Sequence, residues 1–228
     1  MSANAFARRW PKGHPREGFF KSFRTDLRHL EGCDIALDSA GFVASAKYGD
    51  YPWEVQDYIE LVAARPWTHS FAMDYCMEPE IAADAPMRRI RLAATAVNYA
   101  RCARAARRHG VPAPLPVIQG WTLDEYLQCI EWLPVFEWPA LVGIGSMCRR
   151  HVLGPNGILE IVEALDRVLP PTTGLHVFGV KSSAITLLNT LECQQARPSK
   201  PARVQSVDSA AWDFAARAEI RTGRTMEK

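Results

Sequence analysis

The feature that most constrains the fold is an alternation of short apolar segments with longer segments of helical periodicity. The apolar segments predict six strands, whose residue ranges are 35–39, 70–74, 114–120, 140–146, 174–180 and 203–209. Between the strands, apolar residues recur at helical spacing, over residues 52–65, 87–110, 122–136, 157–169 and 183–191. Strands that are apolar almost throughout and alternate with helices predict a parallel sheet covered by helices. A doubly wound sheet and a (β/α) barrel both meet this description.

Polar residues at the ends of the predicted strands favour the barrel. Nearly every strand ends in a polar or glycine motif, and these motifs are Asp38-Ser39, Asp74, Gln119-Gly120, Gly143-Ile144-Gly145-Ser146, Gly179-Val180-Lys181 and Asp208-Ser209. Catalytic groups at the C-terminal ends of many different strands are typical of a barrel, whereas an open sheet gathers them at one switch point. One such residue could simply cap a helix, but three aspartates and a glutamine favour a functional site. We therefore expect an α/β fold of the TIM-like (β/α) barrel type.

The composition is that of an ordinary globular chain of one domain, with 228 residues, 48% hydrophobic and 23% charged. No apolar run approaches the roughly 18 residues that span a bilayer, and the basic N-terminus lacks the apolar core of a signal peptide. The six cysteines never reach Cys-x-x-Cys spacing, which argues against a zinc site and against a secreted disulfide framework. We expect reduced thiols, a cytoplasmic location, and neither a metal nor another cofactor.

The net charge of +2 conceals a segregation of charge along the chain. Residues 1–30 carry seven Lys or Arg against two acids, and residues 31–86 carry eleven acids against two bases. Residues 88–110 then carry seven arginines and no acid. Clustered cations suit a protein that meets a polyanion on one side. The arginines could equally form a solvated helix face, so charge alone does not decide the function.

Six motifs carry a resemblance to a known family. They are DSAGF (38–42), FAMDYC (71–76), PVIQGW (116–121), LVGIGS (141–146), HVFGV (176–180) and SVDSAAWD (206–213). In this order they resemble the motifs of the tRNA-guanine transglycosylase superfamily, and most closely those of its 7-deazaguanine DNA transglycosylase (DpdA-like) branch. The tRNA enzymes carry a zinc site of three cysteines and a histidine near the C-terminus. Nothing after Cys193 could supply that site, which favours DNA over tRNA as the substrate.

The resemblance implies a base exchange in which guanine in the polynucleotide is replaced by a free 7-deazaguanine, such as 7-cyano-7-deazaguanine. Asp208 matches the nucleophile that forms a covalent aspartyl-glycosyl intermediate, and Asp38 matches the general acid and base. The substrate-binding residues that the resemblance implies are Asp74, Gln119, Ser39, and Gly143 or Gly145. Asp74 would accept hydrogen bonds from the N1–H and amino groups of guanine. Beyond the resemblance, position alone makes Arg149, Arg150 and Arg217 the candidates to bind the nucleic acid, because they follow the strand-end motifs.

The N-terminus departs from the family pattern. DSAGF resembles the third barrel strand, yet no good strand is recognisable among the residues before it. Either the N-terminal segment forms short strands that the sequence does not reveal, or the barrel is incomplete or atypical there. A homodimer or a partner subunit could complete it. We expect a basic N-terminal segment over residues 1–32, the barrel domain over 33–217 and a tail over 218–228.

Three alternatives stay open at this point. One is a tRNA-guanine transglycosylase that acts on RNA, and another is a non-catalytic relative that binds nucleic acid. The third is a glycoside hydrolase that uses two of the same carboxylates, with Trp121 and Trp212 as platforms for a sugar. The presence of both Asp38 and Asp208 argues against a binding protein, which would need neither.

Overall fold

The computed structural model describes residues 1–180, 184–188 and 203–209. Within them, all six predicted strands are found in parallel orientation, and each is shorter than expected. They are β3 (Ala36–Leu37), β4 (His69–Ser70), β5 (Val117–Ile118), β6 (Leu141–Ile144), β7 (Gly174–Val177) and β8 (Val204–Val207). Five lie inside their predicted ranges, whereas the second ends at Ser70, the first residue of its predicted range. β5 to β8 form one four-stranded sheet, and β3 and β4 form a separate parallel pair. The fold is therefore mixed α/β with parallel strands.

A single bridge connects the two groups of strands. Phe71 pairs in parallel with Leu115, and the amide of Leu115 donates to the carbonyl of Ser70 at 2.7 Å. Neighbouring strands from β3 to β8 thus follow one another in chain order, without the reversal that defines a doubly wound sheet. No closed barrel forms among the described residues.

The first residues of the chain lie along β3, which is a feature that the sequence did not predict. Ser2 pairs in parallel with Asp38, and the amide of Ala3 donates to the carbonyl of Asp38 at 2.7 Å. Short strands also precede residue 33, although none is recognisable in the sequence, because β1 (Ala7–Arg9) and β2 (Phe20–Phe23) form an antiparallel hairpin. The N-terminal segment therefore supplies both a neighbour for β3 and a projecting hairpin.

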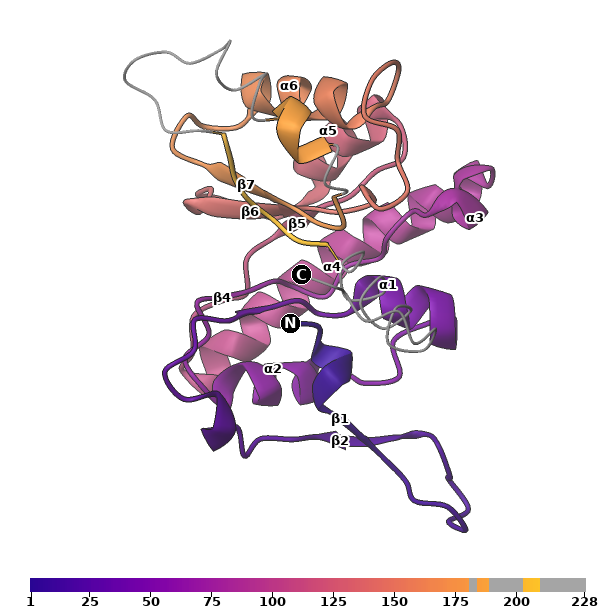
Figure 1. Cartoon of the computed structure of the whole chain (residues 1–228), viewed down its shortest axis with the longest axis vertical. Coiled ribbons are helices and arrows are strands. Elements are labelled where there is room, and N and C mark those ends of the chain that lie inside the picture. The colour runs from indigo at the N-terminus through magenta and orange to yellow at the C-terminus, as the bar shows by residue number, and fades with distance from the viewer. Residues whose placement is uncertain (181–183, 189–202, 210–228) are drawn as a thin grey trace, which may run out of the picture.

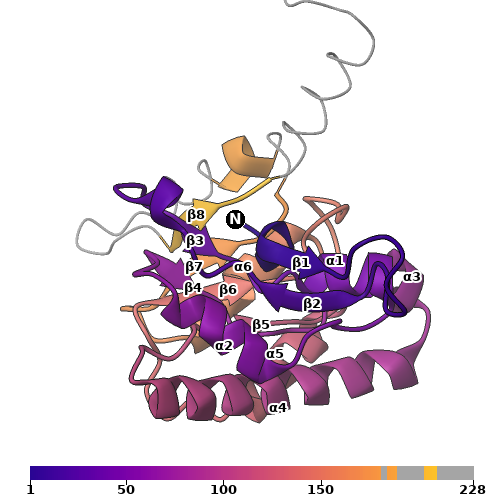
Figure 2. The same ribbon diagram turned by 90° about the horizontal axis from the view of Figure 1, so that it is seen from below.

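Four of the predicted helices are confirmed, and residues 184–188 of the fifth are helical. The four are α2 (Val55–Ala63), α4 (Ala85–His109), α5 (Leu123–Trp132) and α6 (Ile158–Val168). The long helix α4 begins where Asp84 caps the amide of Met87, and it ends at Gly110, whose φ of 67° is left-handed. Shorter helical turns follow β3 and β4, namely α1 (Gly41–Val43), η3 (Ala44–Tyr48) and α3 (Pro79–Ala82), with η1 (Ala3–Phe6) and η2 (Arg28–Leu30) near the N-terminus. Figure 1 shows α5 and α6 on one side of β5 to β7, and Figure 2 shows α4 along the outer edge of the molecule.

The core has two large parts and one small part. The first packs α5 and α6 on the four-stranded sheet through residues such as Ile118, Val142 and Ile161. The second joins β3, α2 and α4 to the N-terminal segment, because it includes Phe6, Phe23 and Leu27. The small part holds the aromatic ring of Phe71 among β5 and β6. No helix in the described ranges is long and apolar enough to cross a membrane.

Candidate active site

Asp38 lies at the C-terminal end of β3, where the chain turns sharply. Ala40, two residues later, adopts the left-handed conformation with φ 72°, and its backbone N–H bonds to the carboxylate of Asp38. Burial first, and then the nearby negative charges of Asp74 and Asp208, together raise the pKa of Asp38 to about 7. Asp38 is therefore close enough to Asp74 and Asp208 to be influenced by the charge of each. A carboxyl group with this pKa can both give and take a proton at neutral pH.

Asp74 follows β4 and is buried, with 7% of its surface exposed. Its Oδ1 accepts a hydrogen bond from the hydroxyl of Ser39 at 3.0 Å, and its Oδ2 accepts one from Nε2 of Gln119. The hydroxyl of Tyr51 donates to the backbone carbonyl of Asp74 at 2.8 Å. Burial raises the pKa of Asp74 to about 6, while the bonds from Ser39 and Gln119 oppose that rise. At neutral pH, Asp74 is thus mainly an ionised acceptor.

A relay of hydrogen bonds fixes the orientation of the Gln119 amide. The backbone N–H of Met77 donates to the hydroxyl of Ser146 at 2.7 Å, so the proton of that hydroxyl is free to point elsewhere. It points to Oε1 of Gln119, at 2.5 Å. The amide oxygen of Gln119 therefore faces Ser146, and its nitrogen must face Asp74.

The two candidate glycines of β6 lie in different places. A Cβ atom on Gly145 would lie 2.5 Å from Cδ of Gln119, so Gly145 is packed directly against the site. A Cβ atom on Gly143 would instead meet the ring of Phe178 at 2.7 Å, inside the small aromatic core. The structure thus brings Gly145, and not Gly143, against the buried polar cluster.

Asp208 follows β8 and is exposed. Its Oδ1 accepts a hydrogen bond of 2.6 Å from the backbone N–H of Gly179, which follows β7. Its backbone carbonyl accepts from the amide of Val180 at 2.9 Å. The neighbouring strand end therefore orients this carboxylate and leaves it accessible.

Carboxylates and an amide from the ends of β3, β4, β5 and β8 thus gather at one end of the strands, as the sequence predicted. A family model described as DeoxyPurine in DNA protein A (DpdA) matches residues 19–223, nearly the whole chain. The chain belongs to the DpdA family. This family is linked to 7-deazaguanine modification of DNA. No curated protein matches the chain.

Two arginines, Arg149 and Arg150, follow β6, where the sequence predicted contact with the nucleic acid. Arg150 is buried, with 6% of its surface exposed. Its guanidinium donates only to protein groups, which are the carbonyls of Ser146, Trp121, Asn156 and Gly120 and the hydroxyl of Tyr126. The group also stacks over the ring of Trp121 at 4.6 Å. Arg150 ties loops together and is not available to DNA in this structure, so we no longer assign it that role. Trp121, beneath a guanidinium, is likewise not an open sugar platform.

Other predicted cations are paired or lie elsewhere. The guanidinium of Arg149 is partly exposed and contacts the acids Glu78, at 3.2 Å, and Glu80, at 2.9 Å. Arg88, near the start of α4, forms an ion pair of 2.6 Å with Glu125. Arg217 and Trp212 lie outside the described residues. Arg149 therefore remains a candidate DNA contact only if its acidic partners release it.

Sequence reasoning missed three residues that lie in or beside this candidate site. Tyr51 lies in a loop whose sequence carries no signal of its contact with Asp74. Ser146 stands in the motif LVGIGS, but its place in that motif does not reveal its bond to Gln119. His176, in β7, stacks on Phe71 with 5.0 Å between ring centres, and its Nδ1 lies 2.7 Å from the hydroxyl of Ser206. Burial lowers the pKa of His176, while the charge of Asp208 opposes this effect.

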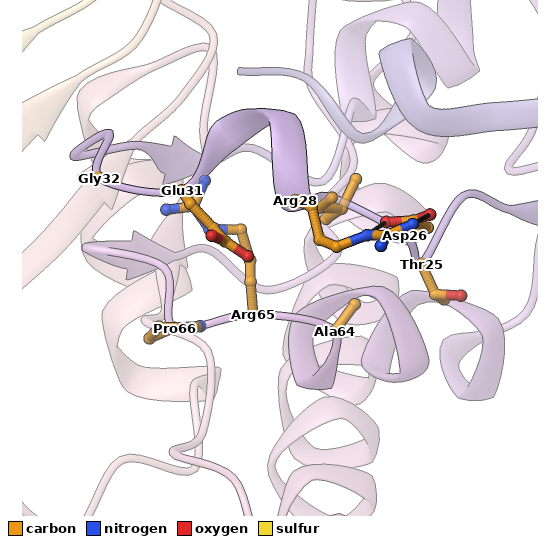
Figure 3. Close-up of a pocket in the computed structure, with 9 residues that line it drawn as sticks. Thr25, Asp26, Arg28, Glu31, Gly32, Ala64, Arg65 and Pro66 are labelled. Carbon is orange, nitrogen blue, oxygen red and sulfur yellow. Dashed lines mark hydrogen bonds and ion pairs between the residues drawn. The ribbon is translucent and has the colours of Figure 1, made fainter.

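The pocket shown in Figure 3 is separate from this site. It measures about 310 Å³ and is lined by residues 25–28, 31–32 and 64–66. These segments precede β3 and β4, so they lie at the opposite ends of the strands from Asp38 and Asp74. Two of its charged lining residues, Asp26 and Arg28, are exposed and pair with each other at 2.8 Å. We assign no chemistry to it.

Proposed function

We propose that this chain exchanges guanine in DNA for a free 7-deazaguanine, such as 7-cyano-7-deazaguanine, through a covalent aspartyl-glycosyl intermediate. The observation that supports this most is the raised pKa of Asp38, about 7, which arises from burial and from two neighbouring carboxylates. Base exchange needs one group that is protonated when guanine leaves and deprotonated when the new base attacks. Because its pKa is about 7, Asp38 can be either protonated or deprotonated at neutral pH.

In the first step, an oxygen of Asp208 attacks C1′ of the deoxyribose, and the bond from C1′ to N9 of guanine breaks. Asp38, in its protonated form, gives its proton to the departing guanine. The N–H of Gly179 holds one oxygen of Asp208 at 2.6 Å, which would orient the carboxylate for attack. The result is a sugar bound covalently to Asp208.

In the second step, the free 7-deazaguanine occupies the place that guanine left. The carboxylate of Asp38 takes the proton from N9, and N9 attacks C1′ while the bond to Asp208 breaks. Two displacements at the same carbon restore the original configuration of the sugar. The enzyme returns to its starting protonation state, so it needs no cofactor.

Asp74 would recognise the guanine edge common to both bases. Its carboxylate already accepts two donors, the hydroxyl of Ser39 and the amide of Gln119. The N1–H and amino group of the base would replace these two donors, and Gln119 would turn to another edge of the base. When no base is bound, Ser39 and Gln119 thus supply the hydrogen bonds of the Asp74 carboxylate, which lowers the free-energy cost of burying its charge.

We also propose how the candidate active site is completed. A TIM-like (β/α) barrel, completed by a second subunit, would bring Asp208 opposite Asp38. A second substrate, tRNA, is the alternative, but no specific observation favours it. A non-catalytic role is not favoured, because it gives no reason for the raised pKa of Asp38.

The experiment that tests the proposal traps the intermediate. Wild-type protein is incubated with guanine-containing DNA and no free base, denatured, and analysed for a protein–DNA adduct by electrophoresis and mass spectrometry. We expect an adduct at Asp208 and none with Asp208→Asn, because an amide does not attack C1′. An adduct of undiminished yield in Asp208→Asn would show that another residue is the nucleophile.

A further inference from the structure

The hairpin formed by β1 and β2 is a strongly basic, exposed element. Arg8, Arg9, Lys12, Arg16, Lys21 and Arg24 stand in it or beside it, and Glu17 is the only acid before residue 25. Five of the six cations are exposed, the exception being Arg9. Glu17 is already engaged, since it accepts the backbone N–H of Gly13 at 2.8 Å. The hairpin therefore presents nearly uncompensated positive charge.

The cations of the hairpin are held in place without being neutralised. Trp10 lies under two of them, with the ammonium of Lys21 at 4.6 Å and the guanidinium of Arg16 at 6.0 Å from its ring centre. Among the described residues, Lys12, Arg16 and Lys21 form no ion pair. A cation over an aromatic ring keeps N–H groups available to a phosphate.

The base of the hairpin is fixed to the candidate active site by aromatic rings. Phe20 and Phe23 pack on Trp53, with ring centres 5.6 and 5.1 Å apart. Trp53 in turn packs on Tyr51 at 5.7 Å. The hydroxyl of Tyr51 donates to the backbone of Asp74 at 2.8 Å. Two aromatic layers thus connect the hairpin to the residue that we propose binds the base.

The hairpin lies on the same side of the molecule as the candidate active site. The residues that lead into the hairpin start beside Asp38, because Ser2 pairs in parallel with that residue. Figures 1 and 2 both show the tip of the hairpin on the same side as α1 and α3, the helices that follow β3 and β4. The C-terminal ends of the strands carry the proposed site on that side.

A surface hairpin with lysines could be solvated and bind nothing. Phe19 argues against this, because 67% of this large apolar side chain is exposed between cations. In the major groove of DNA, an exposed apolar side chain such as Phe can contact the methyl group of thymine.

We propose that the hairpin of residues 7–23 is an arm that binds duplex DNA beside the target base. This inference rests on the proposed function, because a base inside a duplex must be extruded before it reaches Asp38, and the flanking duplex must be held meanwhile. A two-stranded β-ribbon fits the major groove. Six residues separate Ala7 from Gly13, which allows a reach of roughly 20 Å at about 3.3 Å per residue. Lys12, Arg16 and Lys21 contact phosphates, and Phe19 contacts the bases or sugars.

The test compares two triple variants of the full chain that lose the same charge. One is Lys12→Gln/Arg16→Gln/Lys21→Gln, and its matched control is Arg104→Gln/Arg107→Gln/Arg108→Gln at the far end of α4, where all three arginines are exposed. Binding to a fluorescent DNA duplex is measured by anisotropy at several salt concentrations, and far-UV circular dichroism checks that each variant is folded. Duplex RNA is measured in parallel.

The hairpin variant should bind DNA at least tenfold more weakly, and its slope of log Kd against log salt should fall by about 2–3, or roughly 0.9 for each lost phosphate contact. The control should retain the wild-type slope. Phe19→Ala should weaken binding without changing the slope, because it removes no charge.

Several outcomes would overturn the inference. They are an unchanged slope in the hairpin variant, an equal loss in the α4 control, and a loss confined to RNA. Failure of the wild-type protein to bind DNA at all would overturn the proposed function as well. If the wild-type protein binds DNA strongly and the hairpin variant binds it equally well, only the proposed DNA-binding role of the hairpin is overturned.

Discussion

Gly145 and Gln119 are in such close contact that a side chain at position 145 would overlap the amide. A Cβ atom there would lie 2.5 Å from Cδ of Gln119 and nearer still to its nitrogen. Gln119 is itself held by Ser146 on one side and Asp74 on the other. One methyl group at position 145 would therefore disturb the whole polar cluster.

We expect Gly145→Ala to lower exchange at least tenfold by displacing Gln119 from Asp74. A lost hydrogen bond that leaves a buried partner unsatisfied costs about 1–3 kcal/mol. The matched control is Gly174→Ala, because the three atoms nearest to an added Cβ there all belong to the exposed side chain of Gln205. The measurement is the exchange rate of both variants, and equal rates would contradict this role for Gly145.

Asp74→Asn should weaken binding of free guanine and of 7-deazaguanine alike. An amide offers one acceptor oxygen where the carboxylate accepts from both Ser39 and Gln119, so one donor of the base would lose its partner. The expected loss is roughly ten- to a hundredfold in affinity. Isothermal titration with each free base measures it, and unchanged affinity would place Asp74 outside the base pocket.

Arg150 should contribute to stability and not to DNA affinity. Arg150→Met removes a buried guanidinium that donates to four backbone carbonyls. We expect the free energy of unfolding to fall by on the order of 3 kcal/mol, as measured by urea denaturation. The control, Arg167→Met, changes a side chain that is 75% exposed, and should cost less than about 0.5 kcal/mol. A stable Arg150→Met protein with weakened DNA binding would restore the role that the sequence predicted.

Asp38 should make folding stability depend on pH. Its pKa rises from 3.8 in the unfolded chain to about 7 in the folded protein, so the folded state holds the proton more tightly. The contribution of Asp38 to the free energy of unfolding is therefore fully present below about pH 4. It is lost as the pH rises to about 7, by up to about 1.4 kcal/mol per pH unit. Asp38→Asn should lack this component. Urea denaturation between pH 4 and 8 measures the difference, and parallel curves for the two proteins would contradict the raised pKa.

The sequence predicts the elements that carry the site better than the contacts within it. The strand positions and Asp38, Asp74, Gln119 and Asp208 follow from apolar runs that end in polar residues, because parallel strands align their carboxyl ends. The hairpin was missed, since Ala7–Arg9 is too short and too charged to look like a strand. The role of Arg150 was also beyond prediction, because its partners are backbone carbonyls, which have no sequence signature.

The central claim is base exchange in DNA, and incorporation of a labelled base tests it most directly. Wild-type protein is incubated with radiolabelled guanine, or with 7-cyano-7-deazaguanine, and either guanine-containing DNA or tRNA, and label in the polynucleotide is counted. We predict label in DNA, little in tRNA, and none with Asp208→Asn. Label in tRNA alone, or no label in DNA with either base, would contradict the account.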